Sequence, residues 1–323
     1  MFKNKGCMLA IATLVAALFI VTSLLDLYTD VAWFETLGFT SILWTRIISQ
    51  WVLFIVAWLV AAVVLAINWL LARRLAGQRL AVPWLHPQPT RNRVTAEATT
   101  RIVANRTADL LLVAAAVGVS LFFALPARAV WLTAQLSFHA PLFGQSDPIL
   151  SRDLSFYIFR LPWLRFLQGW FLWLILFSLV GAALVYIAST SAERLAAKVQ
   201  VIQEDQPWLQ LSEAAERHLL MLGAIALALI AWGYQLSIPR LLYSTSGAAY
   251  GASYADIHAR LPVMYVLTAV AAVGAVILLA STFVRVRWLP YAAVGVWLAV
   301  LFLGGSLYPS LLQRLLVEPN ELA

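Results

Sequence analysis

Three acidic side chains near the N-terminus are the first residues that could perform chemistry. Asp26, Asp30 and Glu35 lie within one short stretch of the sequence, and clustered carboxylate oxygens can hold a calcium ion. The simpler interpretation is an acidic, solvated loop, so we keep these three as weak metal candidates only. Cys7 is the single cysteine, which excludes a disulfide or a CxxC metal or redox site within this sequence.

A second set of candidates lies in two segments further along the chain, and its side chains are those that acid–base or metal-assisted hydrolysis needs. The set comprises His139, Asp147, Asp153, Asp256 and His258. Nothing in the sequence shows that the two segments meet. The four-residue spacing of Asp256 and Arg260 instead predicts an ordinary surface ion pair on a helix. Walker, G-x-S-x-G, H-E-x-x-H and G-x-G-x-x-G motifs are absent, so we assign no catalytic residue and no cofactor.

The elements that must position these residues are long apolar helices. Apolar residues make up 63% of the sequence and charged residues only 11%, whereas a soluble domain carries about 25% charged residues. An uncharged run of about 20 residues satisfies its backbone inside a bilayer only as a spanning helix. The sequence therefore predicts an all-α, polytopic membrane domain over residues 1–312. Its seven predicted spans are residues 8–27, 47–72, 108–125, 166–187, 219–236, 262–283 and 288–308.

Basic residues predict the orientation of these spans. Lysine and arginine are retained on the cytoplasmic side, and most of the 22 in this sequence fall on the side of the N-terminus. This pattern predicts a multi-pass protein of the bacterial cytoplasmic membrane, with the N-terminus in the cytoplasm and the C-terminus outside. The net charge of +7 is confined to short loops, so we interpret it as a topology signal and expect no nucleic-acid partner.

The predicted spans carry no ionisable or cofactor-binding residue near their middle. Ionisable residues such as Asp109 and His218 fall at span ends, whereas an ion path usually places one near mid-bilayer, at a cost of about 2.5–3.5 kcal/mol. No pair of histidines suits a haem, and no lysine lies in a span to bind retinal. The sequence thus argues against a pump or a proton-coupled transporter, although an uncharged polar path stays open.

The outer segments are more complex than the spans. Residues 126–166 are too polar to span and too aromatic for a free loop, so we expect short helices in the membrane interface. Ser146 or Asp147, followed by Pro148, predicts the start of one such helix. Together with the loops after the first span and before the sixth, this segment forms a predicted docking surface for another membrane or extracytoplasmic protein. The residues of this surface are Trp33, Phe34, Asp153, Phe156, Tyr157, Tyr250, Tyr254, Asp256 and His258.

Four stretches of sequence together resemble a known family. They are YTDVAWFETLGF after the first span, DPILSRDLSFYIFRLPWLRF before the fourth, GAAYGASYADIHARLP before the sixth and YPSLLQRLLVEPNE after the seventh. In order and spacing they look like the large bacterial family of membrane proteins called uncharacterised protein family 0182. The resemblance implies a seven-helix membrane region followed by a much larger extracytoplasmic domain, which would begin in the tail of residues 313–323. It supplies no activity and no catalytic residue.

Three functions are compatible with these observations. We expect a non-enzymatic membrane anchor, scaffold or accessory subunit whose outer mouth docks another protein. One alternative is a transport or lipid-handling protein with an uncharged substrate path, which a cavity open to one leaflet would favour. The other is a membrane enzyme at the outer interface that uses Asp153, Asp256 or His258.

Overall fold

The computed structural model describes residues 3–76, 93–199, 211–244, 251–284, 286–308 and 311. Across these residues the all-α prediction is confirmed, and the β pairing found there is an isolated bridge between Ser146 and Asp153. The predicted tail, residues 313–323, lies outside the described residues.

Long helices make up most of the described chain, and short helical turns lead into or out of several of them. The α-helices are α1 (Lys3–Thr36), α2 (Thr40–Leu75), α3 (Arg93–Ala129), α4 (Trp131–Phe138), α5 (Leu161–Val199), α6 (Glu213–Ser237), α7 (Leu261–Ala280) and α8 (Leu289–Phe302). The turns are the 3₁₀-helix η2 (Ile238–Tyr243) and the π-helices η1 (Phe156–Arg160), η3 (Asp256–Arg260) and η4 (Leu303–Leu307).

Six helical segments of the described chain are long and apolar enough to cross a membrane. They are Thr13–Thr36, Thr40–Leu75, Arg106–Ala129, Phe156–Ser189, Glu213–Tyr243 and Asp256–Ala280. The seventh predicted span corresponds to a shorter apolar helix, Leu289–Gly305. The prediction of exactly seven spans is therefore not confirmed.

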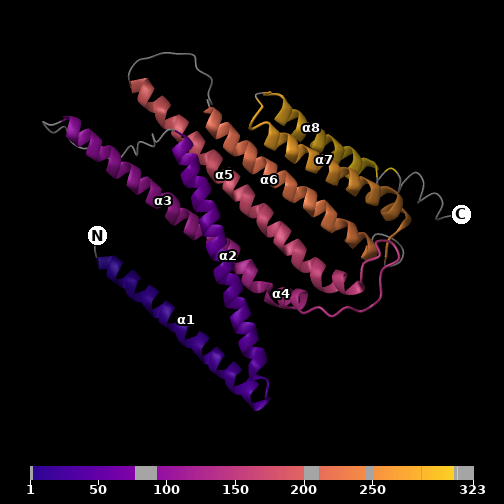
Figure 1. Cartoon of the computed structure of the whole chain (residues 1–323). Coiled ribbons are helices and arrows are strands. Elements are labelled where there is room, and N and C mark those ends of the chain that lie inside the picture. The colour runs from indigo at the N-terminus through magenta and orange to yellow at the C-terminus, as the bar shows by residue number, and fades with distance from the viewer. Residues whose placement is uncertain are drawn as a thin grey trace.

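The long helices lie side by side in a row (Figure 1). Helices α3, α5, α6, α7 and α8 run roughly parallel across the row, and α2 crosses α3 and packs against both α3 and α5. Helix α1 packs against α2 and diverges from the rest of the row, so that its membrane-length segment has no buried residue. Most of the surface of each helix is therefore left for lipid.

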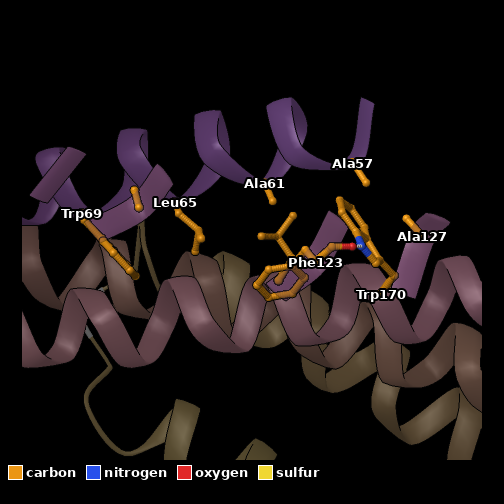
Figure 2. Close-up of a cluster of buried hydrophobic side chains, with 9 residues drawn as sticks. Ala57, Ala61, Leu65, Trp69, Phe123, Ala127 and Trp170 are labelled. Carbon is orange, nitrogen blue, oxygen red and sulfur yellow. Dashed lines mark hydrogen bonds between the residues drawn. The ribbon is translucent and has the colours of Figure 1, made fainter. Parts of the chain in front are cut away.

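Small residues form the contact at the centre of the row. Figure 2 shows side chains of α2 that recur every four residues and face α3 and α5, and small residues at this spacing let helix backbones approach closely. This cluster contains Ala57, Ala61, Leu65 and Trp69 of α2, Phe123 and Ala127 of α3, and Trp170 of α5. The indole N–H of Trp170 donates to the Phe123 carbonyl at 3.0 Å. Gly181 of α5 lies so close to Trp69 that an added Cβ would be 2.0 Å from the indole nitrogen.

The row has two chemically different ends. At one end α2 finishes and α6 begins, and this basic end carries Arg73, Arg74 and Arg217. The opposite end carries residues 139–157, between α4 and α5, and the described residues 238–244 and 251–260, between α6 and α7. We call these two segments together the platform.

Candidate docking platform

Asp147 organises the first segment of the platform. Its carboxylate is buried and accepts hydrogen bonds from the backbone N–H groups of Ile149 at 2.8 Å, Leu150 at 2.6 Å and Arg152 at 3.0 Å. The Tyr157 hydroxyl also donates to it. The predicted helix start at Ser146 or Asp147 is therefore wrong, because the carboxylate of Asp147 captures these backbone donors in a tight turn instead.

Asp153 holds the two sides of this segment together. Its carboxylate accepts from the backbone N–H groups of Phe143 at 3.2 Å, Gly144 at 2.8 Å and Ser155 at 2.8 Å. The bonds from Phe143 and Gly144 come from across the loop, and the bond from Ser155 comes from the first turn of the helix that follows. Asp153 thus fixes residues 143–144 against the start of the α5 segment.

Hydrogen bonding shifts the acidity of both carboxyl groups in the same direction. Burial alone would raise the pKa of Asp147, but the four hydrogen bonds outweigh it and lower the pKa to about 2. Hydrogen bonds from the Ser155 hydroxyl and N–H, with those from Phe143 and Gly144, overcome desolvation and lower the pKa of Asp153 to about 2. Both groups are therefore ionised at neutral pH, which does not suit a general acid.

Asp256 plays a similar part in the second segment. It forms a capping box with Ser253: the Asp256 N–H donates to the Ser253 hydroxyl at 3.2 Å, and the Ser253 N–H donates to the Asp256 carboxylate at 3.0 Å. Arg260 also donates to this carboxylate at 2.8 Å. The predicted ion pair is thus present, but the prediction of a surface pair is wrong, since the Asp256 side chain is 0% exposed.

The two helices that leave the platform begin in the same way. The π-turn η1 ends at Arg160 and is followed by Leu161 and Pro162, and η3 ends at Arg260 and is followed by Leu261 and Pro262. A proline inside a helix lacks a backbone donor and clashes with the carbonyl four residues earlier. The wider π-turn accommodates both effects, so each Arg-Leu-Pro sequence lies at a local change of helix pitch.

The two segments of the platform meet through apolar contacts. Ile149 and Leu150 from the first segment line one crevice with Leu241 of η2 and with Asp256 and Ile257. The crevice has a volume of about 10 Å³, and even one water needs at least about 10–15 Å³. The contact is therefore a packed joint with no room for a substrate.

The acid–base candidates do not assemble into one centre. Asp147, Asp153 and Asp256 each bond to their own segment, as described above. His139 contacts the Gln135 carbonyl at 3.0 Å, and His258 contacts the Tyr254 carbonyl at 3.1 Å. Within the described residues, no group of three or more His, Cys, Asp or Glu side chains is placed to hold a metal ion.

Several residues of the predicted docking surface do lie on the platform. Tyr254 is exposed and stacks on His258 with ring centroids 4.0 Å apart, while Phe156 and Tyr157 are half-buried. Tyr250 lies outside the described residues. Phe138 at the end of α4 and Leu142 and Phe143 of the first segment are exposed large apolar side chains that the sequence prediction missed. Aromatic and apolar residues beside a polar turn were the signal that could have identified them.

The part of the predicted surface after the first span lies elsewhere. Trp33, Phe34 and the metal candidates Asp26, Asp30 and Glu35 all belong to helix α1, so the predicted loop is helical as far as Thr36. The turn to α2 comes at Gly38, whose φ of +75° favours glycine.

That turn is remote from the platform. Helix α4 meets α2 at Ser49, whose hydroxyl accepts from Gln135 at 2.6 Å, nine residues or about 14 Å along α2 from its start. Of the three predicted outer segments, the two that form the platform meet, and the turn after the first span lies apart from them along α2.

These observations define a class of protein: an all-α chain with six helices that are long and apolar enough to cross a membrane, and with ordered polar segments at one end of the helix row. The chain belongs to the Uncharacterised protein family (UPF0182), whose model matches residues 7–323. The resemblance in the four stretches is thereby confirmed.

Relatives in this family are much longer than the chain. It is 34% identical over 319 residues to a UPF0182 protein of Synechococcus sp. (strain JA-2-3B'a(2-13)), a match that covers 94% of the chain and 33% of the relative. A UPF0182 protein of Cupriavidus necator is 32% identical over 317 residues, or 97% of the chain and 32% of the relative. The chain thus spans about a third of the length of these relatives. No solved structure matches it.

Proposed function

We propose that this chain is a non-enzymatic membrane scaffold of the bacterial cytoplasmic membrane, with the platform outside and the basic end in the cytoplasm. The observation that carries the proposal is the structural role of the carboxylates of Asp147, Asp153 and Asp256. These carboxylates hold the platform in one conformation through bonds to their own segments. A surface that is already ordered loses less conformational entropy when a partner binds.

The partner that fits this surface is an extracytoplasmic polypeptide. Exposed Phe138, Leu142, Phe143 and Tyr254 stand beside the polar turns, and aromatic anchors within a polar rim are typical of protein interfaces. The matched region makes up about a third of each relative described above. In such a relative, a platform of this kind would give the additional polypeptide a fixed base on the membrane.

Photo-crosslinking in native membranes tests the docking proposal. A photoreactive residue at Phe143 or Tyr254 is expected to capture an extracytoplasmic polypeptide. The same residue at Phe19, an exposed position on α1, is the control and should capture lipid. Asp153→Asn should reduce capture from Phe143 several-fold, because an amide has one acceptor oxygen in place of two. Capture at Phe143 and Tyr254 no greater than at Phe19 would overturn the proposal.

Cysteine labelling tests the proposed orientation. In a Cys7→Ser background, a membrane-impermeant maleimide should label Tyr254→Cys in intact spheroplasts and should label Arg217→Cys only after permeabilisation. The opposite pattern would place the platform in the cytoplasm.

A lipid-handling function is the second candidate. Its supporting observation is a groove between α2 and α6 at the basic end, lined mainly by apolar side chains. For an enzyme acting through Asp153, Asp256 or His258, the described residues offer no comparable support.

A further inference from the structure

The groove at the basic end lies between the last turns of α2 and the first half of α6. Its volume is about 460 Å³, within the range of about 300–1,000 Å³ for ligand sites. The lining residues used in the argument are Asn68 and Leu71 of α2 and Arg217, His218, Met221 and Ile225 of α6.

The floor of the groove is a fixed polar group. His218 is buried, and its two ring nitrogens contact the Tyr186 hydroxyl at 2.9 Å and the Asn68 side-chain oxygen at 3.2 Å. Asn68 in turn donates its amide N–H to the Val64 carbonyl at 2.7 Å. With Asn68 oriented in this way, His218 donates from Nε2 and accepts at Nδ1 from the tyrosine. This network fixes the position of α6 relative to α2 and α5 and shapes the groove.

The rim of the groove at the start of α6 carries opposite charges. Arg217 lies 3.9 Å from Glu213, and the two side chains are 50% and 66% exposed. An exposed i,i+4 pair of this kind contributes little to stability. Arg217 can therefore turn to a phosphate at small cost, and its planar guanidinium can donate two parallel hydrogen bonds to phosphate oxygens.

Along α6 the groove changes from charged to apolar. Met221 and Ile225 follow Arg217 at four-residue spacing and are exposed, and Leu71 faces the groove from α2. From Glu213 to Ile225 the helix rises about 18 Å. The groove thus has a charged end and an apolar stretch along a membrane-length helix. This order of polarity matches that of one lipid molecule.

We propose that this groove binds a glycerophospholipid from the leaflet at the basic end. The phosphate contacts Arg217, and one acyl chain lies along Met221, Ile225 and Leu71. The phosphodiester is common to anionic and zwitterionic phospholipids, so it is the group that Arg217 recognises. The site is at the opposite end of the row from the platform, and the proposal does not depend on docking there.

Native mass spectrometry of the purified full chain, titrated with phosphatidylglycerol, phosphatidylethanolamine or diacylglycerol, tests the proposal. We expect both phospholipids to bind and diacylglycerol, which lacks phosphate, to bind at least about tenfold more weakly, the factor that one charge-assisted hydrogen bond provides. Arg217→Gln should weaken phospholipid binding by a similar factor. Ile225→Trp should abolish it by filling the groove.

Matched controls come from the platform end, where Arg160→Gln and Ile158→Trp alter exposed residues of the same types. These variants should bind phospholipid as the unmodified chain does. Equal losses in the control variants, or equal binding of diacylglycerol, would overturn the proposal. So would a dimer that Ile225→Trp dissociates, since the groove would then be covered by a second copy of the chain.

Discussion

Asp147 accepts hydrogen bonds from three backbone N–H groups and one tyrosine hydroxyl. An ionised carboxylate can accept all four of these bonds, and a protonated carboxyl group cannot. Protonation would replace an acceptor by a donor that faces other donors. Asp153 has three backbone donors in the same relation. The order of the first platform segment is therefore coupled to the ionisation of these two residues.

Acidification should loosen this segment. Both carboxyl groups have pKa values of about 2 in the folded chain, lowered from the usual 3.8. A lowered pKa stabilises the fold above pH 4, and this contribution is lost as the pH falls through about 2. A spin label on Leu142→Cys, in a Cys7→Ser background, should become more mobile between pH 4 and pH 2.

The control for acidification is a label on Leu14→Cys, an exposed position of α1, which should change little over the same range. Equal changes at the two sites would contradict a role for Asp147 and Asp153 in ordering the loop.

Residue roles could be predicted only in part. The sequence singled out Asp147, Asp153 and Asp256, but the partners of the first two are mainly backbone N–H groups, and residue types say nothing of where those groups point. The capping box of Ser253 and Asp256 follows a readable S-x-x-D spacing close to the usual S/T-x-x-E/Q pattern. In contrast, the ion pair of buried Arg73 with Asp109 joins residues 36 positions apart, and it required the α2–α3 contact to be known.

At the scale of single elements, helices were easier to predict than their ends. Each of the first six predicted spans lies mainly within a membrane-length helix of the structure, since a long apolar run has no other stable backbone in lipid. The helices continue beyond those runs, because polar and aromatic residues that favour the interface do not break a helix. Helix α1 reaches Thr36, nine residues past the predicted end, and stops only just before Gly38.

The close contact between α2 and α5 can be tested by substitution at Gly181. Gly181→Ala places a Cβ 2.0 Å from the Trp69 indole nitrogen, and overpacking of this kind costs about 1–3 kcal/mol. The variant should therefore unfold at a lower temperature in detergent.

Gly169→Ala is the control for Gly181→Ala, because it lies in the same helix with nothing within 4 Å of the added Cβ. It should be neutral or slightly stabilising, since alanine favours the helix by up to about 1 kcal/mol over glycine. If the two variants unfold alike, the close approach of α5 to Trp69 is not as described.

At the scale of the whole molecule, the helices form an open row instead of a closed bundle, and stability is concentrated where neighbouring helices touch. Phe123 is 5% exposed within the α2–α3–α5 cluster, whereas Phe19 on α1 is 72% exposed. Phe123→Ala should cost on the order of 3 kcal/mol in unfolding free energy, and Phe19→Ala should cost little. Thermal unfolding of the two variants in the same detergent compares them directly.

A comparable loss in both phenylalanine variants would mean that α1 is packed against the row, contrary to the arrangement in Figure 1. The sequence could not predict the row, because apolar periodicity does not distinguish a face that touches lipid from one that touches another helix.

The order of helices across the row also bears on how the chain is made. It broadly follows the order of synthesis: α3 packs mainly against α2, and α5 packs against α2 while its Trp170 also reaches Phe123 of α3. During insertion α2 and α3 can therefore pair first, and α5, α6, α7 and α8 can then dock in turn, each on a helix already in place. No earlier pair has to open for a later helix. Until α5 is inserted, the face of the α2–α3 pair that later contacts Trp170 still faces lipid.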